Sequence, residues 1–332
     1  MYKVLVTDGL DPQGVDILKK DCEVRLVEGL SQEELLDQVS SVHGLIVRGT
    51  TRVTGKVLDA GRNLRVVARA GVGLDNIDVA EAVRRGISVV NVPGANAVAV
   101  AELCLALLLS LARHIGEASL AVRHGKWRSP AHNGFELSGK TLGIVGLGRI
   151  GREVCTRALA FGMTVLAHDP YVPEETCLDA GARPVELGEL LGCSDVITLH
   201  TPLTSETRGM IGLRELRTMK RGALLVNCAR GGIVNEDALY DALVCGHLGG
   251  AGLDVFQSEP PGPSPLLSLP NVLATPHLGA ATREARRRCS IAVAMATQRV
   301  LKGECLNPEA CLCQGSHDLG ACSPLASANP VQ

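Results

Sequence analysis

The sequence has few aromatic side chains and almost no net charge. Phe, Trp and Tyr together make up 2% of the 332 residues, which excludes an aromatic surface for stacking nucleic-acid bases. The formal net charge is −2, so neither nucleic acid nor an anionic membrane is an expected partner.

The sequence also lacks long apolar runs. The longest, residues 97–112, is interrupted by Glu102 and Ser110 and is shorter than the roughly 20 residues that span a bilayer. We expect a buried helix there. No signal-peptide pattern follows Lys3, because only a few apolar residues precede Asp8. A cytoplasmic protein with no membrane contact is predicted.

The twelve cysteines include no C-x-x-C pair. Most lie in apolar runs, such as Cys104 and Cys155, where thiols act as small hydrophobic groups in a reduced, cytosolic protein. Residues 307–332 have no periodicity and are expected to be disordered. The cysteines in and just before this tail have a spacing that matches no standard zinc site, so no metal is predicted.

Two alternating series of short apolar runs and helical patterns predict two α/β domains. In the first series, strands are expected near residues 3–7, 23–27, 44–47, 66–68 and 88–91, with helices at 13–20, 31–39, 54–60 and 79–85. Ser31 and Glu34 form a capping-box pattern. A buried helix near 98–111 and a segment without clear period at 121–139 follow.

The second series begins at Thr141 and predicts a complete six-strand dinucleotide domain. Further strands are expected at 164–168, 184–185, 196–199, 223–227, 250–253 and 272–274, with helices at 152–161, 188–192, 213–219 and 236–245. A long amphipathic helix at 282–301 then has no partner left in sequence and is expected to return to the first domain. The predicted architecture is two doubly wound parallel-sheet domains. A Rossmann NAD domain (96–280) is inserted into a flavodoxin-like substrate domain (1–95 and 281–306), with a substrate cleft between them.

A glycine-rich turn opens the second series. Gly146, Gly148 and Gly151 satisfy G-x-G-x-x-G directly after an apolar run. In a dinucleotide fold the first glycine allows a tight turn, the second lets the backbone approach a pyrophosphate, and the third lets helix and strand pack. Asp169 ends the next apolar run, at the position of the carboxylate that binds the ribose hydroxyls. It would repel a 2′-phosphate, so NAD is predicted rather than NADP; a plain turn residue before Pro170 is the alternative.

Three polar residues follow strands of the second series: Arg230, Glu259 and His277. Singly they read as a loop arginine, a surface glutamate and a turn histidine. Together they form a hydride-transfer set. Imidazole can take a hydroxyl proton at neutral pH, a carboxylate can orient the ring, and a guanidinium can hold a substrate carboxylate. The set predicts a 2-hydroxy acid substrate.

Several motifs resemble those of the D-isomer-specific 2-hydroxyacid dehydrogenases, and the likeness extends from about residue 3 to residue 302. They are the glycine turn 146–151 and segments 45–48, 69–78, 124–127, 200–202, 227–234, 252–256 and 276–280. The resemblance implies oxidation of 3-phosphoglycerate to 3-phosphohydroxypyruvate with NAD, by a homodimer or homotetramer in contact through residues 97–139.

The resemblance also assigns site residues. Arg230, Glu259 and His277 are implied to be catalytic. Cofactor contacts are implied for Val72, Asn96, Gly146, Gly148, Arg149, Ile150, Gly151, Asp169, Thr201, Cys228, Ala229, Arg230, Asp254, His277, Gly279 and Ala280. Substrate contacts are implied for Arg48, Arg69, Val72, Gly73, Arg230 and His277. Arg48 also closes a four-residue apolar strand, where an anionic substrate explains it better than solvent does.

Two departures from the family pattern keep alternatives open. Resembling enzymes usually carry lysines just after the tryptophan, whereas Trp127 is followed here by Arg-Ser-Pro-Ala-His. That change favours a glyoxylate or hydroxypyruvate-type 2-ketoacid reductase. Many relatives also continue into C-terminal domains that bind serine, which predicts no serine feedback for this sequence. A non-catalytic, NAD-sensing protein like the C-terminal-binding corepressors is the remaining alternative.

Overall fold

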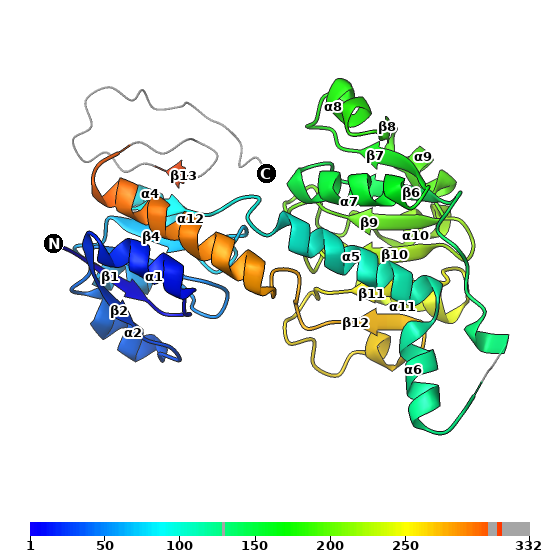
Figure 1. The fold of residues 1–332 in the computed structure, drawn as a ribbon, viewed down its shortest axis with the longest axis horizontal. Helices are drawn as coiled ribbons and strands as arrows, with labels where there is room; N and C mark the ends of the chain where they lie inside the picture. Colours follow the sequence, from blue (N-terminus) through cyan, green and yellow to red (C-terminus); the bar gives the residue numbers. More distant parts are fainter. Residues whose placement is uncertain (128–129, 305–310, 314–332) are drawn as a thin grey trace. The chain divides into compact units, whose positions relative to one another are not determined.

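The computed structural model describes residues 1–127, 130–304 and 311–313, and these divide into two compact units. The first unit contains Met1–Asn96 and the described residues from Ala280 onward, and the second contains Ala97–Gly279. Each unit is built on its own sheet (Figure 1).

The first unit has a parallel five-stranded sheet in the order β5-β4-β3-β1-β2. Its strands are β1 (Tyr2–Val6), β2 (Cys22–Leu26), β3 (Gly44–Val47), β4 (Val66–Arg69) and β5 (Ser88–Val90). Its helices are α1 (Pro12–Lys19), α2 (Gln32–Val39), α3 (Gly55–Ala60), α4 (Val79–Arg84) and α12 (Arg283–Leu301). The order is the flavodoxin-like one, as predicted.

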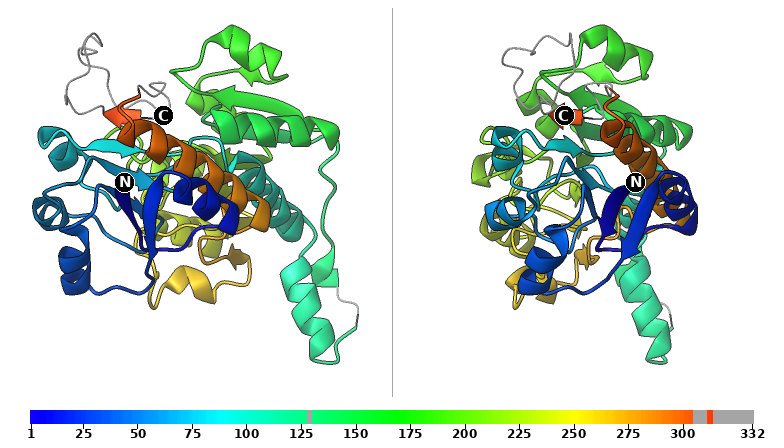
Figure 2. Two further views of the ribbon diagram at one scale, coloured as in Figure 1. Left: turned by 60° about the vertical axis from the view of Figure 1, so that its left-hand side comes forward. Right: turned by 90° about the vertical axis from the view of Figure 1, so that its left-hand side faces the viewer.

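Helix α12 packs beside α1 and against β3, β4 and β5 (Figure 2). Its apolar side is buried with residues of the first sheet, including Cys289 and Val293. The long helix therefore belongs to the first unit although it follows the second in sequence. The Ser31–Glu34 capping box predicted for α2 is also present.

The tail prediction is wrong at one short segment. Cys311–Cys313 form strand β13, which pairs antiparallel with β5. An apolar edge strand such as β5 is a ready pairing partner for any extended segment, and periodicity over three residues cannot reveal the strand that pairs with it. The rest of the predicted tail lies outside the described residues.

The second unit has a parallel seven-stranded sheet in the order β12-β11-β10-β9-β6-β7-β8. Its strands are β6 (Thr141–Val145), β7 (Thr164–His168), β8 (Arg183–Pro184), β9 (Val196–Leu199), β10 (Leu224–Asn227), β11 (Gly250–Leu253) and β12 (Val272–Ala274). Its helices are α5 (Ala97–Ala112), α6 (Ile115–Arg123), α7 (Arg149–Ala160), α8 (Glu174–Asp179), α9 (Leu187–Cys193), α10 (Leu213–Thr218) and α11 (Glu236–Val244), with 3-10 turns η1 (Pro130–His132) and η2 (Pro265–Ser268).

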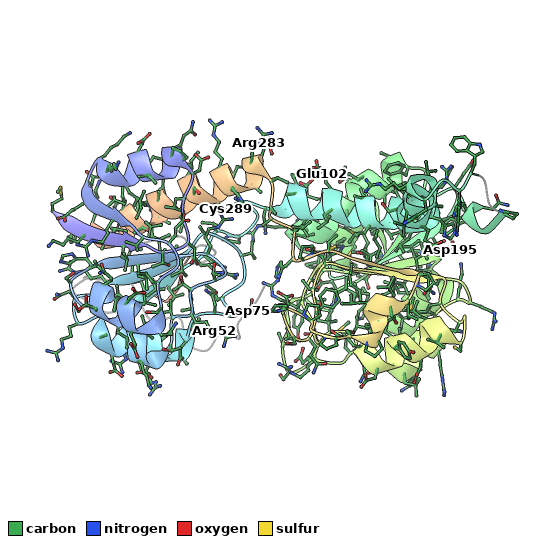
Figure 3. The ribbon with its side chains drawn as sticks, turned by 90° about the horizontal axis from the view of Figure 1, so that it is seen from below. Arg52, Asp75, Glu102, Asp195, Arg283 and Cys289 are labelled. Carbon is green, nitrogen blue, oxygen red and sulfur yellow. The ribbon has the colours of Figure 1, made fainter. Side chains whose placement is uncertain are left out.

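This order is that of a dinucleotide-binding domain with one further strand at the β11 edge. All seven strands lie where the sequence predicted them, one more than the six of the standard domain, and the doubly wound fold is confirmed. Asp195 lies just before β9 (Figure 3). It accepts a hydrogen bond from the Thr141 backbone N–H at 2.8 Å and contacts Lys220 Nζ at 3.0 Å. These contacts fix the starts of β6 and β9 against each other.

Helix α5 is the buried apolar helix expected from the sequence. It packs against β10, β11 and α7, with side chains such as Cys104 and Leu108 in the core. Within the described ranges, no single helix is long and apolar enough to cross a membrane. Helices α5 and α6 meet the length and composition limits only as a pair bent by 64°.

Candidate active site

The glycine turn joins β6 to α7 with the geometry that a dinucleotide requires. Gly146 has φ of +93°, and a Cβ there would lie 2.9 Å from the His200 backbone. A Cβ on Gly151 would lie 2.2 Å from the Gly146 carbonyl oxygen. Gly148 caps α7 and faces open space, because no atom lies within 4 Å of the position that a Cβ would take. The helix N-terminus therefore has room for a phosphate group beside its N–H groups.

Asp169 follows β7 and lies directly beside this turn. Its Oδ2 accepts a hydrogen bond from the Leu147 backbone N–H at 2.8 Å, and its Oδ1 accepts one from Tyr171 N–H at 3.0 Å. The side chain is half-buried. The carboxylate thus closes the turn before Pro170, as a turn residue does. It also stands next to the glycines, where a ribose-binding carboxylate is expected.

Segment 200–201 forms the opposite wall of the turn. His200 Nε2 and Thr198 Oγ1 share a hydrogen bond of 2.9 Å. His200 Nδ1 and Thr201 Oγ1 are buried and have no hydrogen-bond partner among the described residues. Buried polar atoms without partners are rare in folded proteins. With the open space at Gly148 and the carboxylate of Asp169, they fit a polar dinucleotide at this edge of the sheet.

The loop after β10 is shaped by the buried amide of Asn227. Its Oδ1 accepts from Ala229 N–H and its Nδ2 donates to the Arg230 carbonyl, both at 3.0 Å. Arg230 Nη1 donates to the Ala229 carbonyl at 2.7 Å. A hydrogen bond with Cys104 and burial raise the pKa of the Cys228 thiol, so this side chain stays neutral. At 7% exposure, Cys228 and Ala229 can meet a ligand only through a small part of their surface.

Gly231 brings the Arg230 loop onto the segment that leads to Glu259. A Cβ at Gly231 would lie 1.8 Å from the Phe256 carbonyl oxygen, so no other residue fits without moving one of the two loops. Sequence reasoning did not select Gly231. The only feature of the sequence that could have pointed to Gly231 is its position next to Arg230.

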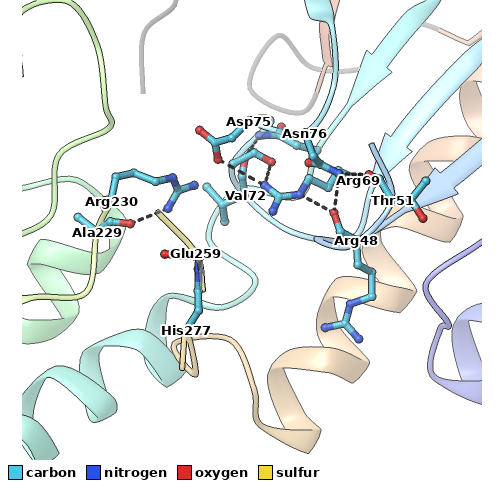
Figure 4. A network of polar contacts seen from close by, with 12 residues as sticks. Arg48, Thr51, Arg69, Val72, Asp75, Asn76, Ala229, Arg230, Glu259 and His277 are labelled. Carbon is cyan, nitrogen blue, oxygen red and sulfur yellow. Dashed lines mark hydrogen bonds and ion pairs between the residues drawn. The ribbon is translucent and has the colours of Figure 1, made fainter. Parts of the chain in front are cut away.

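Glu259 and His277 form the predicted carboxylate–imidazole pair. His277 Nδ1 lies 2.7 Å from Glu259 Oε2, and Glu259 Oε1 accepts from Phe256 N–H at 3.2 Å (Figure 4). The side chains are 49% and 38% exposed. Because Glu259 accepts the proton of Nδ1, the Nε2 lone pair of a neutral His277 is left to face a ligand.

Asp254 holds His277 in place. The carboxylate is 1% exposed and accepts hydrogen bonds from Thr275 Oγ1 at 2.6 Å, Leu278 N–H at 2.7 Å and Gly279 N–H at 2.9 Å. The His277 N–H also donates to the Asp254 carbonyl. His277 has φ of +54°, a conformation that costs energy in a residue with a Cβ. The carboxylate of Asp254 therefore holds the histidine loop, and the cofactor contact expected for this residue stays a prediction.

In the first unit, side chains fix the backbone at Arg48. The Arg48 N–H donates to Asp8 Oδ2 at 2.6 Å, and the Arg48 carbonyl accepts from Arg69 Nε at 2.8 Å and from Asn76 Nδ2 at 3.1 Å (Figure 4). Asp8 also accepts from the Thr51 hydroxyl at 2.6 Å. Burial lowers the pKa of the Arg48 guanidinium, as does nearby Arg286.

Arg69, for which a substrate contact is predicted, binds backbone carbonyls within the first unit. Its guanidinium donates to the carbonyls of Arg48 and Gly73 and lies 4.0 Å from the carboxylate of Asp75, and its side chain is 16% exposed. These acceptors face the N–H groups of the guanidinium, so Arg69 links the Arg48 loop to the Gly73 loop. A strand-end arginine looks the same in sequence whether its acceptor is a ligand or a carbonyl.

The loop that carries Val72 and Gly73 keeps free donors. The Val72 carbonyl accepts from Asn91 Nδ2 at 2.6 Å. Among the described residues, the N–H groups of Val72 and Gly73 have no acceptor. Asn96 Oδ1 is buried without a partner. These groups could receive a small polar ligand.

The predicted residues thus fall into two sets. Within the second unit, the structure groups Arg149 and Ile150 of the first turn of α7 with the glycines, Asp169 and Thr201, and it pairs Glu259 with His277. Val72, Asn96 and Ala280 belong to the first unit. Sequence reasoning missed Asp8, Asn76 and Asn227, polar residues at loop ends whose partners are backbone groups.

The comparisons with known proteins agree with this geometry. Residues 105–279 match the model of the D-isomer specific 2-hydroxyacid dehydrogenase NAD binding domain. The chain is 47% identical over 305 residues to D-3-phosphoglycerate dehydrogenase of Methanocaldococcus jannaschii, covering 92% of this chain and 58% of that protein. It is 48% identical over 294 residues to hydroxypyruvate reductase of Thermotoga maritima, covering 87% of this chain and 95% of that one.

A solved structure has the same fold. The TT0316 protein from Thermus thermophilus superposes with a TM-score of 0.83 at 42% identity, over 91% of this chain and 97% of that chain. The chain belongs to the D-isomer-specific 2-hydroxyacid dehydrogenase family, and its second unit is the family's NAD-binding domain. It spans 58% of the length of the M. jannaschii relative.

Proposed function

We propose that this protein oxidises 3-phosphoglycerate to 3-phosphohydroxypyruvate with NAD. The hydrogen bond of 2.7 Å between Glu259 and His277 is the observation that carries the proposal, because it prepares an imidazole as a base within the same unit as the cofactor turn. The similarity to D-3-phosphoglycerate dehydrogenases supports the choice of substrate.

His277 Nε2 takes the proton of the C2 hydroxyl while the C2 hydride leaves, and Glu259 stabilises the imidazolium that results. NAD, when bound, accepts that hydride, and the products are the 2-keto acid, NADH and one proton. Arg230 holds the carboxylate of the acid and polarises the oxygen at C2. Asp254 keeps His277 in its left-handed backbone conformation throughout.

The first unit supplies the substrate-binding groups. We propose that the N–H groups of Val72 and Gly73 bind the substrate carboxylate and that Arg48 binds an anionic group. In this proposal, residues 1–95 and 281–306 form the substrate domain, and residues 96–280 form the NAD domain. Among the predicted cofactor residues, Asp169 sets the preference for NAD over NADP.

The test is a substrate panel. Purified protein is given 3-phosphoglycerate or D-glycerate with NAD or NADP, and phosphohydroxypyruvate, hydroxypyruvate or glyoxylate with NADH. We expect the highest kcat/KM with the phosphorylated pair and NAD. Turnover of hydroxypyruvate or glyoxylate without turnover of either phosphorylated acid would refute the proposal.

A 2-ketoacid reductase is the second candidate. It is favoured by the similarity to hydroxypyruvate reductase of T. maritima, of which the chain covers 95%. The same catalytic residues would serve, with hydride moving in the opposite direction. The panel above separates the two candidates through the effect of the substrate's phosphate on KM.

We also propose a homodimer or homotetramer in the cytoplasm. Helix α6 buries none of its own residues and exposes Ile115, Leu120 and Val122 by more than half, and Trp127 just beyond is 75% exposed. Apolar groups gathered on one segment favour a subunit contact. Light scattering should give twice or four times the chain mass, and a monomer at micromolar concentration would contradict the proposal.

A further inference from the structure

The start of α12 concentrates positive charge where a helix least favours it. Arg283, Arg286, Arg287 and Arg288 lie in its first two turns, near the positive end of the helix dipole, which disfavours cations. Two of the four have structural partners: Arg287 Nε donates to Gln13 Oε1 at 2.7 Å, and Arg288 Nε donates to the Ala95 carbonyl at 2.9 Å. Arg286 has no hydrogen-bond or ion-pair partner among the described residues.

Arg48 reaches the same part of the first unit. Its side chain extends toward α12, away from the network that fixes its backbone (Figure 4), and it interacts electrostatically with Arg286 and Cys289, which lie one turn apart on that helix. Figure 3 shows Cys289 on α12 beyond Arg283. The Arg48 guanidinium is half-buried and also has no partner among the described side chains.

Arg286 lowers the pKa of the Arg48 guanidinium, because two positive charges near each other repel, and the repulsion is strongest where one of them is partly desolvated. The Asp8 carboxylate raises the pKa of Arg48 by less than Arg286 lowers it, and its hydrogen bonds come from the Arg48 N–H, the Thr51 N–H and the Thr51 hydroxyl. A tetrahedral dianion satisfies both forks at once, since each guanidinium can donate two parallel hydrogen bonds to phosphate oxygens.

The loop geometry adds the second half of the ligand. Arg69 donates to the carbonyls of both Arg48 and Gly73, and so it fixes the spacing between the arginine pair and the free N–H groups of Val72 and Gly73. The arginine pair fits a phosphate, and the N–H groups of Val72 and Gly73 fit a carboxylate. Together the two elements favour a short acid with an anionic group at each end.

We propose that Arg286 joins Arg48 in a two-guanidinium site for the phosphate of a 3-phosphorylated 2-hydroxy acid. The inference rests on the proposed function and deepens it, because it makes Arg286 a residue that determines specificity for the phosphorylated substrate. Arg69 and Asp8 act on this site as positioning residues, through the backbone of Arg48.

The experiment compares R286Q, R286K and the matched control R287Q, which removes the same charge one residue further along the helix. In R286Q we expect KM for 3-phosphoglycerate to rise about tenfold, corresponding to the loss of one charge-assisted contact. The ratio of kcat/KM for phosphohydroxypyruvate to that for hydroxypyruvate should fall by a similar factor. R286K should be intermediate, because lysine keeps the charge without the fork, and R287Q should match the wild type.

Equal increases in KM in R286Q and R287Q would overturn the inference, because they would indicate an effect of the total positive charge on the helix and not of one side chain. An unchanged KM in R286Q, with a wild type that turns over 3-phosphoglycerate, would overturn it and leave the proposed function intact. If the wild type turns over no phosphorylated acid, the proposed function fails. Thermal stabilisation by inorganic phosphate then decides the site separately: a smaller shift in R286Q than in R287Q supports it, and equal shifts refute it.

Discussion

Replacing Asp254 with asparagine separates a scaffold residue from a cofactor contact. In the wild type, Oδ1 accepts from the Thr275 hydroxyl and Leu278 N–H, and Oδ2 accepts from Gly279 N–H. An amide offers only one acceptor oxygen, so its NH₂ group must face at least one backbone donor in a site that is 1% exposed. An unsatisfied buried donor costs about 1–3 kcal/mol, and the remaining bonds lose about 1 kcal/mol each without the charge.

We therefore expect D254N to lower the free energy of unfolding by about 3–5 kcal/mol, read from urea denaturation followed by circular dichroism. Because the loop that holds His277 at φ of +54° is loosened, kcat should fall at least about tenfold. The dissociation constant of NAD should stay within about threefold of the wild-type value, as titrated by fluorescence.

Asp169→Asn is the matched control, since it makes the same chemical change at a half-buried carboxylate beside the glycine turn. There we expect the opposite pattern, with NAD bound about tenfold more weakly and a stability change below about 1 kcal/mol. The reasoning would be refuted if D254N kept the wild-type stability and lost NAD affinity, because Asp254 would then contact the cofactor as the sequence suggested.

Two further predictions concern close packing and the thiols. Gly231→Ala places a Cβ 1.8 Å from the Phe256 carbonyl and should cost about 1–3 kcal/mol of stability with loss of most activity. Gly188→Ala, where no atom lies within 4 Å, should change neither, and equal behaviour of the two variants would contradict the account. Among the eight cysteines whose side chains the structure describes, Cys193 and Cys245 are exposed and the other six are buried. Iodoacetamide at pH 8 should therefore label these two before the other six in peptide mass spectrometry, and early labelling of a buried thiol in native protein would show the core to be wrong.

The sequence predicted well what depends on local pattern. The glycine turn, the capping box at Ser31 and the alternation of strands and helices each arise from a few neighbouring residues, and the structure confirms them. The rule that ligands meet the carboxyl ends of parallel strands also placed Glu259 and His277 together, because both follow strands of one sheet.

What the sequence could not predict are the partners of polar side chains. Asp254 and Arg69 stand at strand ends as ligand-binding residues do, yet each forms hydrogen bonds with backbone groups of loops that are distant in sequence. Helix α6 was missed because its apolar residues face no core and give no clear period. Likewise, β13 depends on the free edge of β5, which only the assembled sheet reveals.

The most direct measurement compares wild-type protein with His277→Asn in NADH formation from 3-phosphoglycerate, with NAD binding measured on the same samples. We predict turnover by the wild type, a fall of about 10²–10⁴-fold in kcat for the variant, and the same NAD affinity in both. A variant that keeps its rate, or a wild type that oxidises neither 3-phosphoglycerate nor any other 2-hydroxy acid, would contradict the role of the Glu259–His277 pair as the base of a hydride transfer.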